Sequence, residues 1–316
     1  CQRRGHDPKG ATLYVTLEPC STHGRTPPCT QAILQHGIHR VVVGATDPNP
    51  RHAGRGLDLL RDAGVAVVTG IETARCTELN DSFNHWIVHR TPWITLKAAL
   101  TLDGRIATAN GESRWITGDA ARRTTMRLRR RHDAILVGIN TVIHDDPQLT
   151  VRLGKHLSCP RRIVLDSRAR TPVSAQLVTD AHAARTLIVV GPRAPLRRVE
   201  RLRQQVEVVV APERDGKPDL AWLCQHLGQR DITSILVEGG GEVHAAFLAA
   251  RLPHRVAFFI APKILGGRSA IRGVGGTGFT GLNQAPLLRN VRSKRVGNDL
   301  LLTAEVVHPD PAPPPA

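Results

Sequence analysis

Aromatic residues are scarce in this sequence: Phe, Trp and Tyr together make up 3% of its 316 residues. Proteins that bind single-stranded nucleic acid stack the bases on aromatic side chains, so the scarcity argues against that class. Long apolar runs are also missing, and none approaches the roughly 18–20 residues that a membrane-spanning helix needs. The chain opens with no signal-peptide pattern. We therefore expect a protein without a membrane partner.

Cysteine is too sparse for a disulfide scaffold, because the chain has only 6 cysteines. A large chain with few and scattered cysteines is typical of a reducing compartment, and we expect a cytoplasmic protein with one candidate metal-binding pair. The six are Cys1, Cys20, Cys29, Cys76, Cys159 and Cys224.

Acidic residues are outnumbered, with 27 Asp and Glu against 43 Lys and Arg, which gives a formal net charge of +16. This balance favours anionic partners, either nucleic acid or phosphorylated small molecules, although a genomic bias toward arginine codons would produce it as well. The segment Arg122–His132 holds several arginines, and we interpret most of them as a solvated helix face. A basic nucleic-acid-binding protein therefore remains the alternative from another functional class.

The length predicts two domains, because a common domain has about 100–200 residues. We place a first α/β domain at 1–90, a larger α/β domain at 91–308 and a Pro-rich tail, extended or disordered, at 309–316. The boundary lies near Arg90–Pro92, where a helical pattern stops at a proline. In the first domain the pattern predicts strands at Thr12–Leu17, Arg40–Ala45 and Val65–Thr69 and helices at Cys29–His36, Leu57–Ala63 and Glu72–Trp86.

The second domain also alternates strand and helix patterns. The predicted strands are Trp93–Leu100, Ile135–Val137, Arg162–Leu165, Thr186–Val190, Val206–Val210, Ile235–Val237, Val256–Ile260 and Leu300–Val307. The predicted helices are Asp119–Arg131, Leu196–Gln204, Leu220–Leu227 and Val243–Ala250.

Cys20 and Cys29 are the candidate metal ligands. Cys29 opens a predicted helix, where the helix dipole favours the thiolate, but two cysteines at this spacing are by themselves more often structural. Their surroundings, Thr16-Leu17-Glu18-Pro19-Cys20 and His23-Gly24-Arg25-Thr26-Pro27-Pro28-Cys29, resemble the core of zinc deaminases. More narrowly they resemble the deaminase half of the bifunctional riboflavin-biosynthesis deaminase/reductases, as does Asp47-Pro48-Asn49-Pro50 with Gly54-Arg55-Gly56. The resemblance implies a cytidine-deaminase-like α/β/α domain that binds Zn²⁺ through both thiols.

One part of the deaminase motif is missing from the chain. The family takes its third zinc ligand and a proton-shuttling glutamate from a His-x-Glu segment, and none precedes Cys20. The upstream His6 is expected to lie in a turn. We expect an N-terminally truncated deaminase domain whose zinc lacks its third protein ligand, with deaminase activity in doubt.

The second domain resembles the reductase half of the same family, which has a dihydrofolate-reductase-like α/β fold and uses NADPH. The resemblance is carried in order over about 170 residues. Its pieces are the Lys97–Thr117 segment KAALTLDGRIATANGESRWIT, Asp145-Asp146-Pro147, Leu149-Thr150-Val151-Arg152, Asp166-Ser167-Arg168, Val237-Glu238-Gly239-Gly240-Gly241 and Ile260-Ala261-Pro262-Lys263.

The glycine triplet after a predicted strand is suited to a phosphate, because its backbone N–H groups can approach an anion at a helix start. The resemblance extends the cofactor contacts to Ala99, Trp115, Thr141, Asp145, Ser167, Gly240, Gly241, Glu242, Val243, His244, Ala245 and Ala246. Arg168 or Arg170 could pair with the 2′-phosphate of NADPH, or both could face solvent.

On the substrate side the resemblance implies contacts from Ser113, Arg129, Leu149, Arg152 and Glu238. Arg129 and Arg152 suit a ribose 5-phosphate, because a guanidinium binds phosphate oxygens in bidentate fashion. Lys97 and Glu238 are the candidates for polarising or protonating the leaving oxygen or nitrogen of the ribosyl carbon.

The implied reactions are deamination of 2,5-diamino-6-ribosylamino-4-pyrimidinone 5′-phosphate and NADPH-dependent reduction of the ribosyl group to ribityl. The substrate partner is thus a phosphorylated pyrimidine. A reductase with an inactive deaminase domain is the alternative within the enzyme class. The sequence leaves open whether the chain forms a homo-oligomer.

Overall fold

The computed structural model describes residues 5–24, 26–50, 52–154 and 156–309. The chain divides into two compact units, Cys1–Arg90 and Thr91–Ala316, which are described separately below. Of the predicted Pro-rich tail, all but Pro309 lies outside the described residues. Among the described helices none has both the length and the apolar character needed to cross a membrane.

The first unit contains a parallel sheet of three strands in the order β1 (Thr12–Leu17), β2 (Arg40–Ala45) and β3 (Ala66–Thr69). Its core forms where Val41 and Val43 of the central strand pack with apolar residues of α1 (Cys29–Gln35) and α2 (Arg55–Asp62). The β-branched run of β2 is buried because this strand lies between two parallel neighbours and packs against helices, whereas the residues of β1 and β3 are exposed or half-buried.

The predicted helix Glu72–Trp86 is two helices in the structure, α3 (Thr73–Leu79) and α4 (Asp81–His89). They are separated at Asn80, whose side-chain amide donates hydrogen bonds to the carbonyl of Cys76 at 2.8 Å and to Thr16 Oγ1 at 3.4 Å. An asparagine side chain that bonds nearby backbone competes with helix propagation. The single-helix prediction was therefore wrong at this residue.

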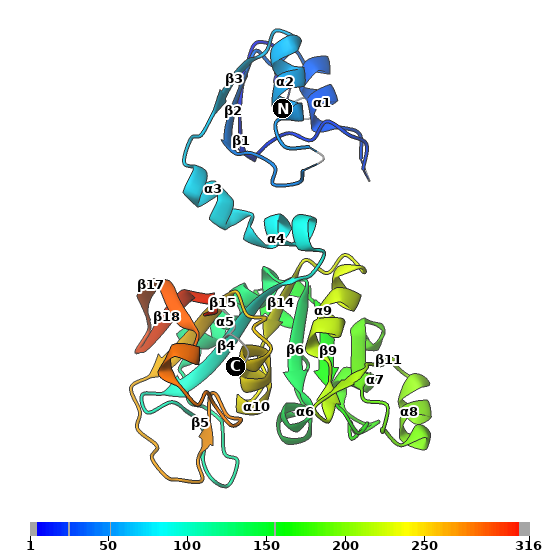
Figure 1. Cartoon of the computed structure of the whole chain (residues 1–316), viewed down its shortest axis with the longest axis vertical. Helices are drawn as coiled ribbons and strands as arrows, with labels where there is room; N and C mark the ends of the chain where they lie inside the picture. Colours follow the sequence, from blue (N-terminus) through cyan, green and yellow to red (C-terminus); the bar gives the residue numbers. More distant parts are fainter. Residues whose placement is uncertain (1–4, 25, 51, 155, 310–316) are drawn as a thin grey trace, which may run out of the picture. The chain divides into compact units, whose positions relative to one another are not determined.

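The second unit is built on a nine-stranded sheet with the order β11-β10-β9-β6-β14-β4-β15-β18-β17 (Figure 1). The seven strands from β11 to β15 are parallel, and β18 and β17 are antiparallel. The strands are β4 (Trp93–Thr101), β6 (Ala134–Gly138), β9 (Arg161–Leu165), β10 (Thr186–Val190), β11 (Glu207–Val210), β14 (Ser234–Val237), β15 (Arg255–Ala261), β17 (Leu287–Val296) and β18 (Asp299–Val307).

Helices cover both faces of this sheet. Along β6, Leu136 packs in the cluster that includes residues of α9 and α10, whereas Val137 packs in the cluster that includes residues of α6, α7 and α8. Successive side chains of a strand point to opposite faces, so the buried run of β6 serves both layers. The helices are α5 (Asp119–Arg130), α6 (Ile139–Asp145), α7 (Gln176–Thr179), α8 (Leu196–Arg203), α9 (Leu220–Gly228) and α10 (Gly241–Ala249), with 3-10 turns η2 (Ala183–Arg185) and η3 (Leu282–Gln284).

Sequence patterns did not predict the edge strand β17. Nine of its ten residues are exposed, and its sequence LLRNVRSKRV lacks the apolar alternation of a half-buried strand. Its basic side chains are typical of an edge strand that resists pairing with other chains. Three short strand pairs were missed as well, β5 (Arg105–Ala107) with β16 (Ile271–Arg272), β7 (Val151–Leu153) with β8 (His156–Ser158) and β12 (Glu213–Arg214) with β13 (Lys217–Pro218).

Candidate functional site

A cavity of about 1920 Å³ lies in the second unit, where β6, β9 and β14 end beside β4. Parallel α/β sheets place ligands outside the carboxyl ends of their strands, and the cavity follows that rule. It brings together most of the residues predicted from sequence: Lys97, Ala99, Ser113, Trp115, Arg129, Thr141, Asp145, Leu149, Arg152, Ser167, Glu238, Gly240, Gly241, Glu242, Val243 and Ala246.

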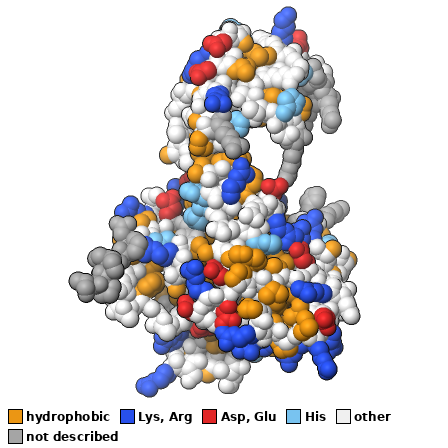
Figure 2. All heavy atoms as spheres, turned by 45° about the vertical axis from the view of Figure 1, so that its right-hand side comes forward, with side chains coloured by type: hydrophobic (Ala, Val, Ile, Leu, Met, Phe, Trp, Pro, Cys, Tyr) orange, Lys and Arg blue, Asp and Glu red, His pale blue; other side chains and the backbone are white. Residues whose placement is uncertain are grey.

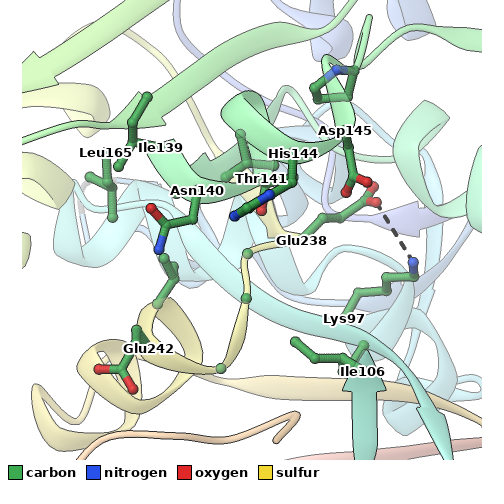
Figure 3. A pocket seen from close by; sticks show the side chains of 18 of the residues that line it. Lys97, Ile106, Ile139, Asn140, Thr141, His144, Asp145, Leu165, Glu238 and Glu242 are labelled. Carbon is green, nitrogen blue, oxygen red and sulfur yellow. Dashed lines mark ion pairs between the residues drawn. The ribbon is translucent and has the colours of Figure 1, made fainter. Parts of the chain in front are cut away.

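Three charged side chains meet on one wall of the cavity. The guanidinium of Arg129 donates to both carboxylate oxygens of Glu238, at 2.6 and 3.0 Å. Lys97 Nζ lies 3.7 Å from Glu238 Oε2, as the dashed line in Figure 3 marks. Glu238 follows the buried strand β14, Lys97 belongs to β4, and Arg129 comes from the last turn of α5, so three elements fix the cluster.

Burial and charge act in opposite directions on the pKa values of this cluster. Burial alone would raise the pKa of Glu238, but Arg129 and Lys97 outweigh it and hold that pKa at about 2. Burial lowers the pKa of Lys97, an effect that Glu238 opposes and Arg129 reinforces. Glu238 is therefore a carboxylate at neutral pH, and Lys97 releases its proton more readily than an exposed lysine does.

Arg129 has a further partner in the protein. Besides its two bonds to Glu238, it donates from Nη1 to the carbonyl of Thr150 at 3.0 Å. Three of its five N–H donors thus bind the protein, and the phosphate contact expected of Arg129 stays a prediction. The geometry of Arg152 is compatible with binding a substrate phosphate. Its side chain is exposed at the cavity, and its described hydrogen bond goes to the neutral amide of Gln148.

The other arginines of α5 are mostly exposed, as expected of a solvated face: Arg123, Arg127 and Arg130 are exposed and Arg122 is half-buried. Arg122 and Arg123 also line the cavity, whereas Arg127 and Arg130 do not.

The three glycines after β14 serve different purposes. A Cβ at Gly239 would lie 2.5 Å from Val243 Cβ, and one at Gly241 would lie 2.3 Å from the carbonyl oxygen of Arg272. A Cβ at Gly240 would meet nothing within 4 Å. Packing therefore requires glycine on either side, while Gly240 leaves open space at the start of α10.

Only one face of α10 borders the cavity. Glu242, Val243 and Ala246 line it, as expected from the helical repeat. His244 is fully buried, with Nδ1 2.8 Å from the carbonyl oxygen of Gly273, and Ala245 is not among the lining residues. His244 and Ala245 therefore do not line the cavity, and the cofactor contacts expected of them stay predictions.

The loop after α6 carries backbone strain at the cavity. Asp146 and Leu149 have positive φ angles of 40° and 52°, which side-chain-bearing residues rarely adopt. Leu149 is nevertheless buried, and Asp145 at the end of α6 accepts a hydrogen bond from Ser113 at 3.4 Å. Such strain is kept where the surrounding structure determines the geometry, often in a ligand site.

Trp115 is an exposed aromatic residue on the cavity lining, with 62% of its surface accessible. The guanidinium carbon of Arg122 lies 4.3 Å from its ring centroid, and Arg114 donates to the carbonyl of Asp145 at 2.6 Å. We did not identify Arg114 or Arg122 from sequence; the adjacency of Arg114 to Trp115 was the available signal for the first.

The first unit brings Cys20 and Cys29 together. The backbone N–H of Cys29 donates to Cys20 Sγ at 3.3 Å, and burial and the neighbouring Cys20 raise the pKa of the Cys29 thiol. That direction is opposite to the thiolate expected from the helix start. Among the described residues no cluster of three His, Cys, Asp or Glu side chains could hold a metal ion. The described donors are thus two thiols, fewer than a zinc site needs.

Sequence reasoning missed the role of Glu18, the buried acid in the cysteine motif. Its carboxylate accepts backbone hydrogen bonds from Asp47 at 3.1 Å, Gly54 at 3.0 Å and Gly56 at 2.9 Å. These bonds fasten the loop before α2 to the segment that carries Cys20.

Comparison with known proteins gives two family matches. A model of the RibD C-terminal domain matches residues 92–302, and one of the cytidine and deoxycytidylate deaminase zinc-binding region matches residues 1–45. The riboflavin biosynthesis protein RibD of Actinobacillus pleuropneumoniae is 43% identical over 304 residues, which are 96% of this chain and 80% of that protein. The chain belongs to the RibD family.

Solved RibD structures agree with this assignment and with the two-domain α/β fold predicted from sequence. RibD of Acinetobacter baumannii matches with a TM-score of 0.83 and 32% identity over 97% of this chain and 84% of that one. A Thermotoga maritima protein described as a diaminohydroxyphosphoribosylaminopyrimidine deaminase/5-amino-6-(5-phosphoribosylamino)uracil reductase matches with a TM-score of 0.81 and 33% identity, over 96% and 82%. RibD proteins are bifunctional deaminase/reductase enzymes of riboflavin biosynthesis, so the resemblance read from the motifs is confirmed.

Proposed function

We propose that the second unit reduces 5-amino-6-(5-phosphoribosylamino)uracil with NADPH. This reduction is the step of riboflavin biosynthesis that we assign to the chain. The single observation that carries the proposal is the shared cavity of Lys97, Glu238 and the glycine turn. A lysine amine, a carboxylate bound by Arg129 and open space at the start of α10 border this cavity, which supports the proposal.

The cavity residues fit the cofactor. Gly240 leaves room at the first turn of α10, a helix of nine residues, and helix starts bind phosphate through free N–H groups. Ala99, a small residue of β4, lines the same cavity beside Lys97 and lets a flat ring approach the strand. We assign the pyrophosphate to the start of α10 and the nicotinamide to the β4 side. Thr141, Asp145 and Trp115 remain proposed cofactor contacts.

Substrate recognition falls to Arg152 and the strained loop. The described hydrogen bond of Arg152 goes to an amide and not to a carboxylate, so its guanidinium charge suits the 5′-phosphate. Leu149 and Ser113 complete the proposed substrate wall, and Glu238 accepts hydrogen bonds from ribose hydroxyls on its remaining lone pairs.

When bound, NADPH supplies a hydride to C1 of the ribosyl group. The bond between C1 and the ring oxygen breaks, and the oxygen needs one proton to become the hydroxyl of the ribityl chain. Lys97 donates that proton, because burial lowers its pKa and Glu238 holds its ammonium group in place. Arg129 is a positioning residue that fixes Glu238.

For the first unit we propose Cys20 and Cys29 as two ligands of a deaminase Zn²⁺. Zinc would act there as a Lewis acid toward the attacking water. The described residues do not complete its coordination, so we derive no deamination step from them. A reductase with an inactive deaminase unit remains the second candidate, favoured by this observation alone.

The experiment is an NADPH-oxidation assay of the full chain with 5-amino-6-(5-phosphoribosylamino)uracil. We expect substrate-dependent oxidation, and a loss of about 10²–10⁴-fold in kcat for Lys97→Gln, the usual contribution of a general acid. The dissociation constant of 2′,5′-ADP should be unchanged in that variant. No oxidation by a chain that binds 2′,5′-ADP would contradict the proposal.

The nucleic-acid alternative predicts a different behaviour. On the face drawn in Figure 2, basic side chains are dispersed among acidic and apolar ones. A duplex-binding protein would show affinity that falls steeply with salt concentration. We propose that no such binding accompanies the reductase activity, and a salt-dependent gel-shift titration tests this.

A further inference from the structure

We infer that Arg170 recognises the 2′-phosphate of NADPH and so selects NADPH over NADH. The inference rests on the proposed function, because it needs a dinucleotide in the cavity. The sequence left Arg168 and Arg170 as equal candidates, and the structure separates them. Both side chains are exposed, but Arg170 lines the cavity and Arg168 does not.

The sheet order sets where the adenosine end lies. Ala99 is on β4, Gly240 follows β14 and Ser167 follows β9, and the intervening order is β4-β14-β6-β9. Neighbouring strands are about 4.8 Å apart, so β4 and β9 are separated by about 14 Å, close to the span of an extended dinucleotide. With the nicotinamide at Ala99 and the pyrophosphate at Gly240, the adenosine ribose falls beside Ser167.

In Figure 3, Asn140 and Leu165 lie on the opposite side of the cavity from Lys97 and Glu238. At that far end Arg170 Nη2 donates to Asn140 Oδ1 at 2.9 Å. The amide is neutral, so the contact orients the guanidinium without cancelling its charge. An oriented guanidinium at a cavity wall is the group that binds a phosphate dianion.

The loop that carries Arg170 is fixed by its own hydrogen bonds. Asp166 accepts from the backbone N–H and the hydroxyl of Thr171, both at 2.7 Å, and closes the loop between them. Ala169 has a φ of 51° and donates to the carbonyl of Asp166 at 3.1 Å. Ala169, at this turn, lies between Arg168 and Arg170 in the sequence. Because the loop is fixed by these hydrogen bonds, we infer that Arg170 is held in position before the cofactor binds.

Two basic residues of the β12–β13 hairpin, Arg214 and Lys217, line the same cavity. Arg214 forms an ion pair with Asp219 at 3.3 Å, which offsets its charge. Lys217 is the competing candidate and enters the test as such.

The test is calorimetric titration of the full chain with 2′,5′-ADP and with 5′-ADP, which differ by the 2′-phosphate. We expect the parent chain to prefer 2′,5′-ADP, and Arg170→Ala to reduce that preference about tenfold or more, the usual loss for a charged hydrogen bond. Arg168→Ala is the matched control and should keep the preference within about twofold. Arg170→Lys should retain part of it, since a point charge replaces the fork.

An unchanged preference in Arg170→Ala would overturn the inference, as would its loss in Lys217→Ala instead. Equal binding of the two ligands by the parent chain would also overturn it. These outcomes leave the proposed reduction intact, because that proposal fails only if substrate-dependent dinucleotide oxidation is absent.

Discussion

Arg129 and Glu238 form a bidentate ion pair, with side-chain exposures of 12% and 8%, at the wall of the cavity. A buried pair of this kind is costly to break, because removal of Arg129 leaves the carboxylate of Glu238 in a poorly solvated place with only Lys97, 3.7 Å away, as its counter-charge. The pair links α5 to the end of β14. It therefore contributes to the stability of the fold and also positions Glu238 in the proposed reductase site.

The first prediction is that Arg129→Ala lowers the free energy of unfolding of the second unit by about 3–5 kcal/mol. Urea denaturation of the full chain measures the change. Arg127→Ala, on the exposed face of the same helix, is the control and should stay within about 0.5 kcal/mol of the parent. Similar losses of unfolding free energy in both variants would show that the Arg129–Glu238 ion pair adds no more stability than an exposed arginine of the same helix.

The second prediction concerns acid. The pKa of Glu238 is about 2 in the folded chain, against an ordinary value of 4.5. A depressed folded pKa adds stability above the unfolded pKa, and that contribution disappears as the pH falls from 4.5 toward 2. Glu238→Gln should flatten the decline of the melting temperature over this window. A decline equally steep in parent and variant would mean that other groups cause it.

The third prediction tests the phosphate contact assigned to Arg152. Arg152→Ala should raise the KM for the phosphorylated substrate about tenfold or more, because a charged hydrogen bond to phosphate is lost. The affinity for 2′,5′-ADP should be unaltered. Steady-state kinetics and calorimetry measure the two effects, with Arg127→Ala as the control. Should Arg127→Ala raise KM equally, general electrostatics and not a site would be responsible.

The fourth prediction separates the glycines of the turn. Gly240→Val should weaken 2′,5′-ADP binding with little change in melting temperature, since its side chain would enter open space. Gly241→Ala should lower the melting temperature, because its Cβ would lie 2.3 Å from the Arg272 carbonyl oxygen. Differential scanning fluorimetry and calorimetry test the pair. Normal 2′,5′-ADP affinity in folded Gly240→Val would refute the phosphate placement.

The fifth prediction concerns metal. Two thiols hold zinc weakly, so Cys1–Ala316 should lose Zn²⁺ to a chelator and should release no ammonia from the deaminase substrate. Fusion of a segment with a His-x-Glu motif upstream of Cys1 should raise zinc content and deamination together. One tightly held zinc per chain, with ammonia release equal to that of the fused protein, would contradict this account of the deaminase site.

The fold was largely predictable where burial dictates the sequence. Runs such as Ala134–Gly138 are buried on both faces and read as strands, and motif order led to the family. The exposed edge strand Leu287–Val296 carries no such pattern, since its backbone pairing is decided by β18. Asn80 was missed because one side chain's hydrogen bonds divide an otherwise continuous helical segment.

The site was predictable as a set of residues but not as a set of contacts. Motifs identified Arg129, Arg152 and Glu238, yet only the structure shows that Arg129 is bonded to Glu238 and that Arg152 is not. His244 was assigned by its place in a motif, whereas its orientation follows from helix geometry. Pairing across the sheet is a tertiary property, which neither spacing nor composition encodes.

The central claim is hydride transfer from NADPH to the ribosyl carbon inside this cavity. The most direct measurement uses NADPH with deuterium at both C4 positions and 5-amino-6-(5-phosphoribosylamino)uracil, with the product examined by mass spectrometry and NMR. The account predicts one deuterium in the product, bound to C1 of the ribityl chain. A product without deuterium, or with deuterium at any other carbon, would contradict it.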